Sequence, residues 1–118
     1  MATDAPRIED YGFGHIVIDG ERYSDDVIIY PERVDDSWWR DQGHLLQMVD
    51  LEEVLEAKPD VLVVGTGAYG RMKLADGVEE ALAERGIEVV AAQTEEACER
   101  YNSLAPDRRT VAALHLTC

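Results

Sequence analysis

The stretch that most constrains this chain is an apolar run, Val61–Val64, which passes directly into three glycines: Gly65, Gly67 and Gly70. A short, unbroken run of β-branched and other apolar residues is typical of a strand that is buried on both faces. The glycines, spaced as G-x-G-x-x-G, predict a tight turn at the end of that strand. A strand covered on both faces needs other elements above and below it, so the run predicts a layered fold.

The rest of the second half alternates between helical and strand patterns. A helix is predicted from Asp50 to just before Pro59. Asp76 is predicted to cap a second helix that ends at Gly86, and Thr94 to cap a third helix that runs to about residue 104. Strands are predicted at residues 87–91 and 111–116. This order implies right-handed crossovers and a partly parallel sheet.

The first third of the chain has the pattern of β structure. Residues 15–18 and 21–23 flank Asp19-Gly20, which is a typical two-residue hairpin turn. A further strand is predicted at residues 27–30, where Pro31 ends it. We therefore predict an α/β fold in which residues 1–118 form a single compact layered domain. Its mixed central sheet carries the N-terminal β-hairpin layer on one face and helices on the other.

Charge and composition exclude several classes of function. The chain has 25 acidic and 11 basic residues and a net charge of −14, which disfavours binding to nucleic acid or to anionic membranes. Acidic residues spread along the whole chain instead indicate adaptation to high salt. No apolar run approaches the ~20 residues that span a bilayer. The charged segment Met1–Asp10 lacks the apolar stretch of a signal peptide, which predicts a cytoplasmic protein without membrane insertion.

Cysteines and histidines give no strong chemical signal. Cys98 and Cys118 are predicted to be free thiols, because their number and spacing match neither a disulfide framework nor a common zinc site. No metal site is predicted. His115 is interpreted as a hydrogen-bonded core or edge residue. Tyr101 is interpreted as a core residue with its hydroxyl at the boundary, and Asn102 as a local polar cap.

The glycine turn has two interpretations. It is either a purely structural turn, or it binds an anionic group through its backbone with help from basic neighbours. The chain is too short for a complete dinucleotide-binding protein, and Arg71–Leu74 leads to a new cap instead of opening a helix. No cofactor is assigned. The ligand-binding candidates are Gly65, Thr66, Gly67, Gly70 and Arg71.

A second cluster, Trp38, Trp39 and Arg40, lies in the long polar connection Glu32–Gly43. One interpretation is that a tryptophan covers the core beneath the sheet. The other is a surface that binds a protein partner, because Trp and Arg are enriched among the residues that dominate binding energy at interfaces. Both can hold, since adjacent residues of a loop can point in opposite directions.

Several short motifs follow one another along nearly the whole chain: Tyr30-Pro31, Trp38-Trp39-Arg40, His44, Gly65-x-Gly67, Gly86–Val89, Gln93–Glu95, Tyr101-Asn102 and His115–Cys118. In this order they resemble the Mth-domain family. The resemblance implies a compact α/β fold with a mixed sheet and no established catalytic mechanism. It also implies protein contacts, since mitochondrial members are assembly factors of respiratory complex I. This chain has adjacent tryptophans where the family more often has a residue between them.

Two functional hypotheses follow, and the first is preferred. In the first, the chain is a non-enzymatic interaction domain that binds a protein partner through Trp38, Trp39 and Arg40 and assists the assembly of a larger complex. In the second, it is a small-molecule (anion or nucleotide) binding domain, or an enzyme, that uses the Gly65–Arg71 turn. No catalytic residue is assigned. Homo-oligomerisation through sheet edges or the tryptophan loop is left open.

Overall fold

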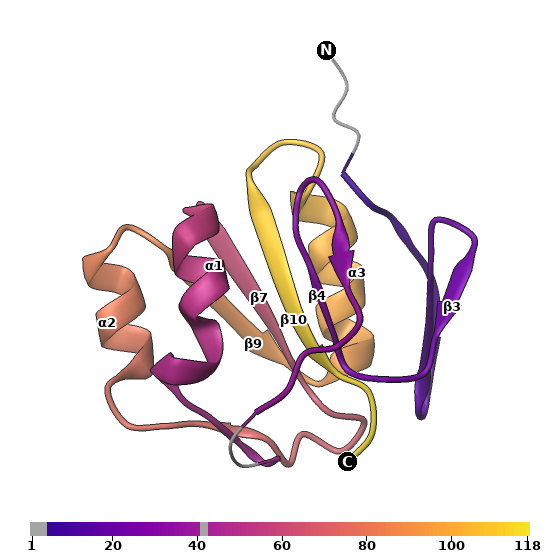
Figure 1. The fold of residues 1–118 in the computed structure, drawn as a ribbon, viewed down its shortest axis with the longest axis horizontal. Coiled ribbons are helices and arrows are strands. Elements are labelled where there is room, and N and C mark those ends of the chain that lie inside the picture. Colours follow the sequence, from indigo (N-terminus) through magenta and orange to yellow (C-terminus); the bar gives the residue numbers. More distant parts are fainter. Residues whose placement is uncertain (1–4, 41–42) are drawn as a thin grey trace.

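The computed structural model describes residues 5–40 and 43–118, and its centre is a five-stranded mixed sheet with the order β5-β4-β10-β7-β9 (Figure 1). β10 runs parallel to β7, and β7 runs parallel to β9. β4 pairs antiparallel with β10, and β5 antiparallel with β4. The predicted mixed sheet is thus confirmed. Its strands are β4 (Val27–Ile29), β5 (Val34–Asp35), β7 (Val61–Thr66), β9 (Glu88–Ala92) and β10 (Thr110–His115).

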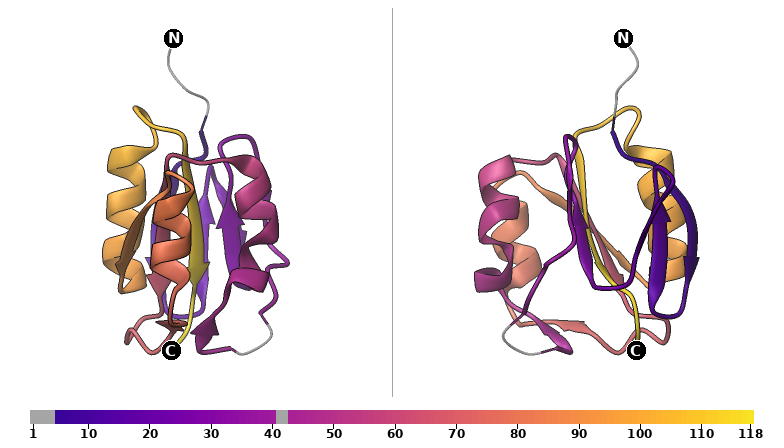
Figure 2. Two further views of the ribbon diagram at one scale, coloured as in Figure 1. Left: turned by 90° about the vertical axis from the view of Figure 1, so that its left-hand side faces the viewer. Right: turned by 45° about the vertical axis from the view of Figure 1, so that its right-hand side comes forward.

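Separate layers cover the two faces of this sheet (Figure 2). On one face lie the N-terminal β-sheet and helix α3 (Thr94–Leu104), and the core there includes Ile16, Val63 and Tyr101. On the other face lie α1 (Glu52–Ala57) and α2 (Val78–Glu84), with Leu62 and Leu82 in their core. The predicted layered α/β fold is confirmed. The prediction that the helices all lie opposite the hairpin layer is wrong for α3, which packs on the same face as that layer.

The N-terminal layer is a three-stranded antiparallel sheet of β1 (Ile8–Gly12), β2 (His15–Ile18) and β3 (Glu21–Tyr23). Asp19 and Gly20 both have positive φ, +50° and +83°, as a type I′ turn requires. The predicted hairpin is therefore confirmed. β1 was not predicted, because only Ile8 among its residues is buried and the strand gives little alternating hydrophobic signal.

The helix boundaries correct two predicted caps. Gly77, with φ +85°, is the N-cap of α2 and no side chain caps that end, so the prediction for Asp76 is wrong. Gln93 is the N-cap of α3, and Thr94 is already helical. The Thr94 hydroxyl instead accepts a hydrogen bond from the Gly67 amide and donates one to the His115 carbonyl oxygen. Hydrogen bonds to residues distant in the sequence therefore replace the expected hydrogen bond between this hydroxyl and the first turn of α3.

Short elements connect the layers. A 3₁₀ helix, η1 (Met48–Leu51), precedes α1, so the helical region begins two residues earlier than predicted. Two short strands, β6 (Leu45–Leu46) and β8 (Lys73–Leu74), form a parallel pair in the connections that follow β5 and β7. No helix in the described part of the chain has both the length and the apolar character needed to cross a bilayer.

Two residues of α3 attach β1 to the rest of the fold. The Tyr101 hydroxyl donates to the Pro6 carbonyl oxygen at 2.7 Å. The Asn102 amide group donates to the Ile8 carbonyl oxygen at 2.7 Å and accepts from the Ile8 N–H at 3.0 Å. Tyr101 is buried as predicted, whereas Asn102 is not a local cap. It supplies the hydrogen bonds that a neighbouring strand would otherwise make to Ile8.

We expect Asn102→Ala to lower the free energy of unfolding by about 1–2 kcal/mol, because it leaves both main-chain groups of Ile8 without this partner. Urea denaturation followed by circular dichroism, at the salt concentration that keeps the protein folded, measures the change. Ser103→Ala, at the exposed next position of α3, should shift it by less than about 0.5 kcal/mol. Equal effects of the two substitutions would contradict the proposed attachment.

Candidate functional site

Three segments that are far apart in the sequence meet where β10 ends. They are Asp26, which directly precedes β4, Arg40 in the connection between β5 and β6, and His115, the last residue of β10. The solvent-exposed fraction of the side chain is 18% for Asp26, 5% for Arg40 and 8% for His115. We call these three residues the Asp26 cluster. It places a charged group in the core directly beside the predicted tryptophan segment.

The Asp26 carboxylate is the centre of the cluster. One oxygen, Oδ2, lies 2.9 Å from Arg40 Nη1 and 2.8 Å from His115 Nδ1. The other, Oδ1, accepts a hydrogen bond from the Leu116 amide at 2.8 Å. Burial raises the pKa of this carboxyl group, but the bonds from His115 and Leu116 and the charges of His115 and Arg40 outweigh that effect. The pKa of Asp26 therefore lies below its ordinary value of 3.8.

The short contact with Asp26 also determines how the His115 ring is used. Nδ1 lies 3.2 Å from Arg40 Nη2 as well, but one ring nitrogen cannot both donate to a carboxylate and accept from a guanidinium. We assign the hydrogen of Nδ1 to the shorter contact, with Asp26. Nε2 is buried and has no hydrogen-bond partner among the described residues. The structure confirms that His115 is a hydrogen-bonded, buried residue.

Arg40 makes further contacts that tie its segment down. Its Nε and Nη2 donate to the Gly43 carbonyl oxygen at 3.1 and 2.9 Å. The guanidinium lies over the Trp38 ring, 4.6 Å from its centroid. With its polar groups engaged inside the protein, Arg40 has little surface to offer a partner. Its place in the structure is that of a residue that positions its neighbours.

The two tryptophans point in different directions. Trp38 is half-buried against the core beneath α1, and its Nε1 donates to the Asp50 carbonyl oxygen at 3.2 Å. Trp39 is 75% exposed. The prediction that one tryptophan covers the core is confirmed by Trp38. The prediction that the segment binds a partner then rests on Trp39.

Trp39 borders two depressions of the surface. The larger, of about 470 Å³, lies between residues 24–26, 36–39 and 116–117. We call it the Trp39 cleft. The smaller, of about 180 Å³, includes the exposed Val49 in its wall. The indole of Trp39 is therefore accessible from two sides.

The glycine turn is closed by the last residues of the chain. Ala68 and Arg71 donate their amides to the main-chain oxygens of Thr117 and Cys118, at 2.7 and 3.1 Å. Gly67 donates to the Thr94 hydroxyl at 2.9 Å, and Gly70 to the Gly67 carbonyl oxygen at 3.2 Å. These amides are the groups that would hold an anion, and they are occupied. Binding of an anion at this turn stays a prediction that this geometry does not favour.

The two predicted sites are linked through one segment. Leu116 and Thr117 line the Trp39 cleft, and Thr117 also holds the glycine turn. Arg71 is exposed, whereas Gly65 and Gly67 are buried. Thr66, at the end of β7, donates from its hydroxyl to the Ala92 carbonyl oxygen at 3.0 Å. Sequence reasoning did not identify Asp26 or Thr94 as parts of this region, because their partners are distant in the sequence.

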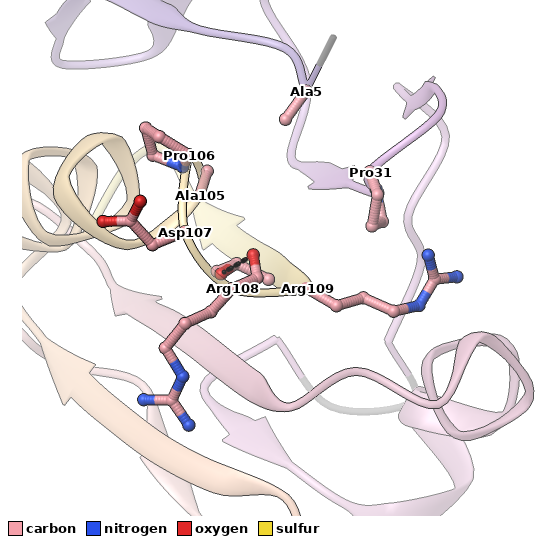
Figure 3. A pocket seen from close by; sticks show the side chains of 8 residues that line it. Ala5, Pro31, Ala105, Pro106, Asp107, Arg108 and Arg109 are labelled. Carbon is pink, nitrogen blue, oxygen red and sulfur yellow. Dashed lines mark hydrogen bonds between the residues drawn. The ribbon is translucent and has the colours of Figure 1, made fainter. Parts of the chain in front are cut away.

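A further cavity, of about 280 Å³, lies at the start of β10 (Figure 3). The Asp26 cluster lies at the other end of that strand. Arg108 and Arg109 border it, but their side chains point away from each other (Figure 3). Each is paired with a carboxylate of the protein, Glu88 at 3.0 Å and Glu32 at 2.9 Å. The rest of the lining consists of alanine and proline residues with Asp107 and Thr110, so the cavity has no converging set of charged side chains.

Other reactive groups are either buried or dispersed. Cys98 is buried, and burial raises the pKa of its thiol to about 12, so it stays protonated at neutral pH. Within residues 5–40 and 43–118, no group of three or more His, Cys, Asp or Glu side chains is arranged to hold a metal ion.

The fold and these motifs define a small, layered α/β protein of the Mth type. The chain belongs to the family described as "Protein of unknown function (DUF498/DUF598)", which matches residues 8–116. This chain is similar to the conserved hypothetical protein PH1505 from Pyrococcus horikoshii OT3, whose crystal structure is known. The two sequences are 32% identical and the two structures superpose with a TM-score of 0.81. The match covers 95% of this chain and 99% of that one. The resemblance predicted from the motifs is thus confirmed.

Two further relatives carry informative names. A Bordetella pertussis protein described as a Mth938-like domain is 23% identical with a TM-score of 0.62. That match covers 94% of this chain and 85% of that one, and shows a common fold. A Danio rerio protein named NADH dehydrogenase [ubiquinone] 1 alpha subcomplex assembly factor 3 is 38% identical over 68 residues, 58% of this chain. The match spans only 38% of that relative's length.

We expect Asp26→Asn to lower the free energy of unfolding by about 3 kcal/mol, because it leaves the Arg40 guanidinium buried without its counter-charge. Urea denaturation at constant potassium chloride measures the loss. An asparagine can still accept from the Leu116 amide, so the substitution tests the ion pair. Asp25→Asn, at the exposed neighbouring position, should change the free energy of unfolding by less than about 0.5 kcal/mol.

The Asp26→Asn variant also allows a prediction of how the free energy of unfolding changes with pH. Because the folded-state pKa of Asp26 lies below 3.8, its stabilising contribution is present above that value and is lost as the pH falls through the folded pKa. The stability difference between wild type and Asp26→Asn should therefore shrink as the pH falls below about 4. A difference that stays constant under acid would contradict this.

We expect Gly67→Ala to destabilise the protein by at least about 2 kcal/mol. Gly67 has φ +107°, and a Cβ there would lie 2.3 Å from the Cys118 carbonyl carbon. Gly20→Ala is the matched control, because Gly20 also has positive φ but nothing lies within 4 Å of a Cβ. It should cost only about 1 kcal/mol of conformational strain. Equal losses in thermal denaturation would show that the contact with residues 117–118 is unimportant.

Proposed function

We propose that this chain is a non-enzymatic interaction domain that helps assemble a larger protein complex, and that Trp39 is the central residue of its contact surface. The observation that carries this proposal is that Trp39 is 75% exposed while the residues on both sides of it are anchored. Trp38 packs on the core and Arg40 is bound within the Asp26 cluster. The indole is thereby held outward in a defined place.

An exposed and anchored tryptophan is well suited to bind a partner. The indole offers a large apolar area, and anchoring reduces the conformational entropy lost when a partner binds. Trp is enriched among the residues that contribute most to binding energy at protein interfaces. Val49 borders the same small depression, so Trp39 has an apolar neighbour on the surface.

The net charge of −14 supports a particular setting for such an interface. At molar salt, the Debye length is only ~3 Å, so the dispersed carboxylates no longer repel a second protein at a distance. Contacts through apolar area do not weaken in the same way. We propose that the protein acts in a cytoplasm of high salt, where Trp39 rather than net charge selects the partner.

The name of one relative supports an assembly role. That relative is named as an assembly factor, and the family description assigns no reaction. The alternative of a small-molecule site at the glycine turn has less support, because the amides of Gly67, Ala68 and Arg71 are already bonded within the protein. The interaction domain is therefore the function that the geometry favours.

The test is affinity capture of the tagged protein from its own host in multimolar potassium chloride, with partners identified and quantified by mass spectrometry. We expect one protein at a constant ratio to the bait, and a loss of at least about tenfold with Trp39→Ala. Tyr69→Ala is the matched control, because Tyr69 is also an exposed aromatic residue but lies in the glycine turn. It should leave capture unchanged.

Unaltered capture by Trp39→Ala, with its fold intact by circular dichroism, would overturn the proposed surface. Arg40→Ala is unsuitable for this purpose because it removes a buried counter-charge and disturbs the fold. If the captured protein is a second copy of this chain, the wild type should sediment as a dimer and Trp39→Ala as a monomer.

A further inference from the structure

The surface around Trp39 is acidic on both sides. Asp25, Asp26 and Asp36 line the Trp39 cleft, and four more carboxylate residues line the smaller depression, namely Asp35, Asp50, Glu52 and Glu53. Neither lining includes a Lys or Arg among the described residues. The indole thus rises from a surface of one sign of charge, although the whole chain contains 11 basic residues.

Not all of this charge is available to a partner. Asp26 is paired with Arg40 and His115, and Glu53 lies 3.9 Å from Arg33. Asp25 and Asp36 are exposed, and neither has an ion-pair partner within the described residues. They are therefore the carboxylates of the Trp39 cleft that remain open to an external cation.

We propose that the Trp39 cleft binds an arginine side chain presented by the partner protein, with the guanidinium stacked on Trp39 and paired with Asp25 or Asp36. The proposal rests on the function proposed above and specifies the chemistry of the partner. A planar guanidinium can stack on an indole and form paired hydrogen bonds with a carboxylate, which a lysine ammonium cannot do in the same geometry.

The neighbouring residues already show this arrangement inside the protein. The Arg40 guanidinium lies 4.6 Å from the Trp38 centroid and 2.9 Å from Asp26 Oδ2. The partner's arginine would make the equivalent set of contacts on the outer side, with Trp39 as the ring. Because the cleft has a volume of about 470 Å³, it has room for the side chain together with part of its main chain.

High salt does not abolish such a contact. Stacking and ion pairing act at about 3–4 Å, which is comparable with the Debye length of ~3 Å at 1 M salt. Charge that is merely dispersed over the surface is screened under the same conditions. Binding that persists at high salt therefore distinguishes a specific arginine site from the general attraction of a basic peptide to an acidic protein.

The probe is a fluorescent, terminally blocked peptide of alternating glycine and arginine, titrated into the full chain and followed by anisotropy. A second peptide replaces each arginine with citrulline, which keeps the shape and removes the charge. We expect the citrulline peptide and the Trp39→Ala variant each to raise the Kd by at least about fivefold. Equal binding of the two peptides would overturn the proposal.

Two double variants separate the site from net charge. Asp25→Asn with Asp36→Asn should raise the Kd of the arginine peptide by at least about fivefold. Glu80→Gln with Glu84→Gln, which removes the same charge from exposed positions of α2, should raise it less than about twofold. Equal weakening by the two pairs, or no binding at millimolar peptide, would show that the cleft does not recognise arginine.

The outcome also distinguishes this proposal from the function on which it rests. If partner capture depends on Trp39 but is unchanged by Asp25→Asn with Asp36→Asn, the interaction domain stands and the arginine site is wrong. If capture does not depend on Trp39, the interaction surface itself is wrong. If both changes abolish capture, replacing arginines in the captured partner with uncharged glutamine should abolish it as well.

Discussion

The burial of two adjacent parallel strands, β7 and β10, determines how the rest of the chain must be arranged. Their residues pair in register from Val61 opposite Thr110 to Thr66 opposite His115, and all of β10 is buried. Neither strand can face water, so each face of the sheet needs its own layer. Helices α1 and α2 form one layer, and α3 with the N-terminal sheet forms the other (Figure 2). The end of β10 then places His115 beside Asp26, which precedes β4, and beside Arg40, which follows β5.

Features with a local physical cause could be predicted from the sequence. The turn at Asp19-Gly20 follows from the need for two positive φ values, and Gly86, with φ +80°, ends α2 for a similar reason. The apolar run Val61–Val64, rich in β-branched residues and followed by glycine, indicates a covered strand. In the candidate site, the adjacent pair Trp38 and Trp39 could be predicted to divide between core and surface, because neighbouring loop residues can point in opposite directions.

The remaining features depend on contacts between distant residues. Asp26 is 89 residues from His115, and Arg40 is 75 residues from it, so no local pattern reports their pairing. Threonine is a common N-cap residue, so Thr94 was expected to cap α3. Its hydroxyl instead forms hydrogen bonds with Gly67 and His115, because the turn after β7 lies against the start of α3. β1 becomes a strand through its pairing with β2 and its bonds to α3, not through its own hydrophobic pattern.

The Asp26 cluster is better explained by geometry than by stability. A buried ion pair gains little over apolar residues of the same size, because both charges must lose their water. An apolar side chain at Arg40 could fill space, but it could not bond to Asp26 and the Gly43 carbonyl oxygen while covering the Trp38 ring. These directional contacts specify one path for the main chain on either side of Trp39. We infer that the charge is kept in the core because it fixes the orientation in which an exposed indole is presented.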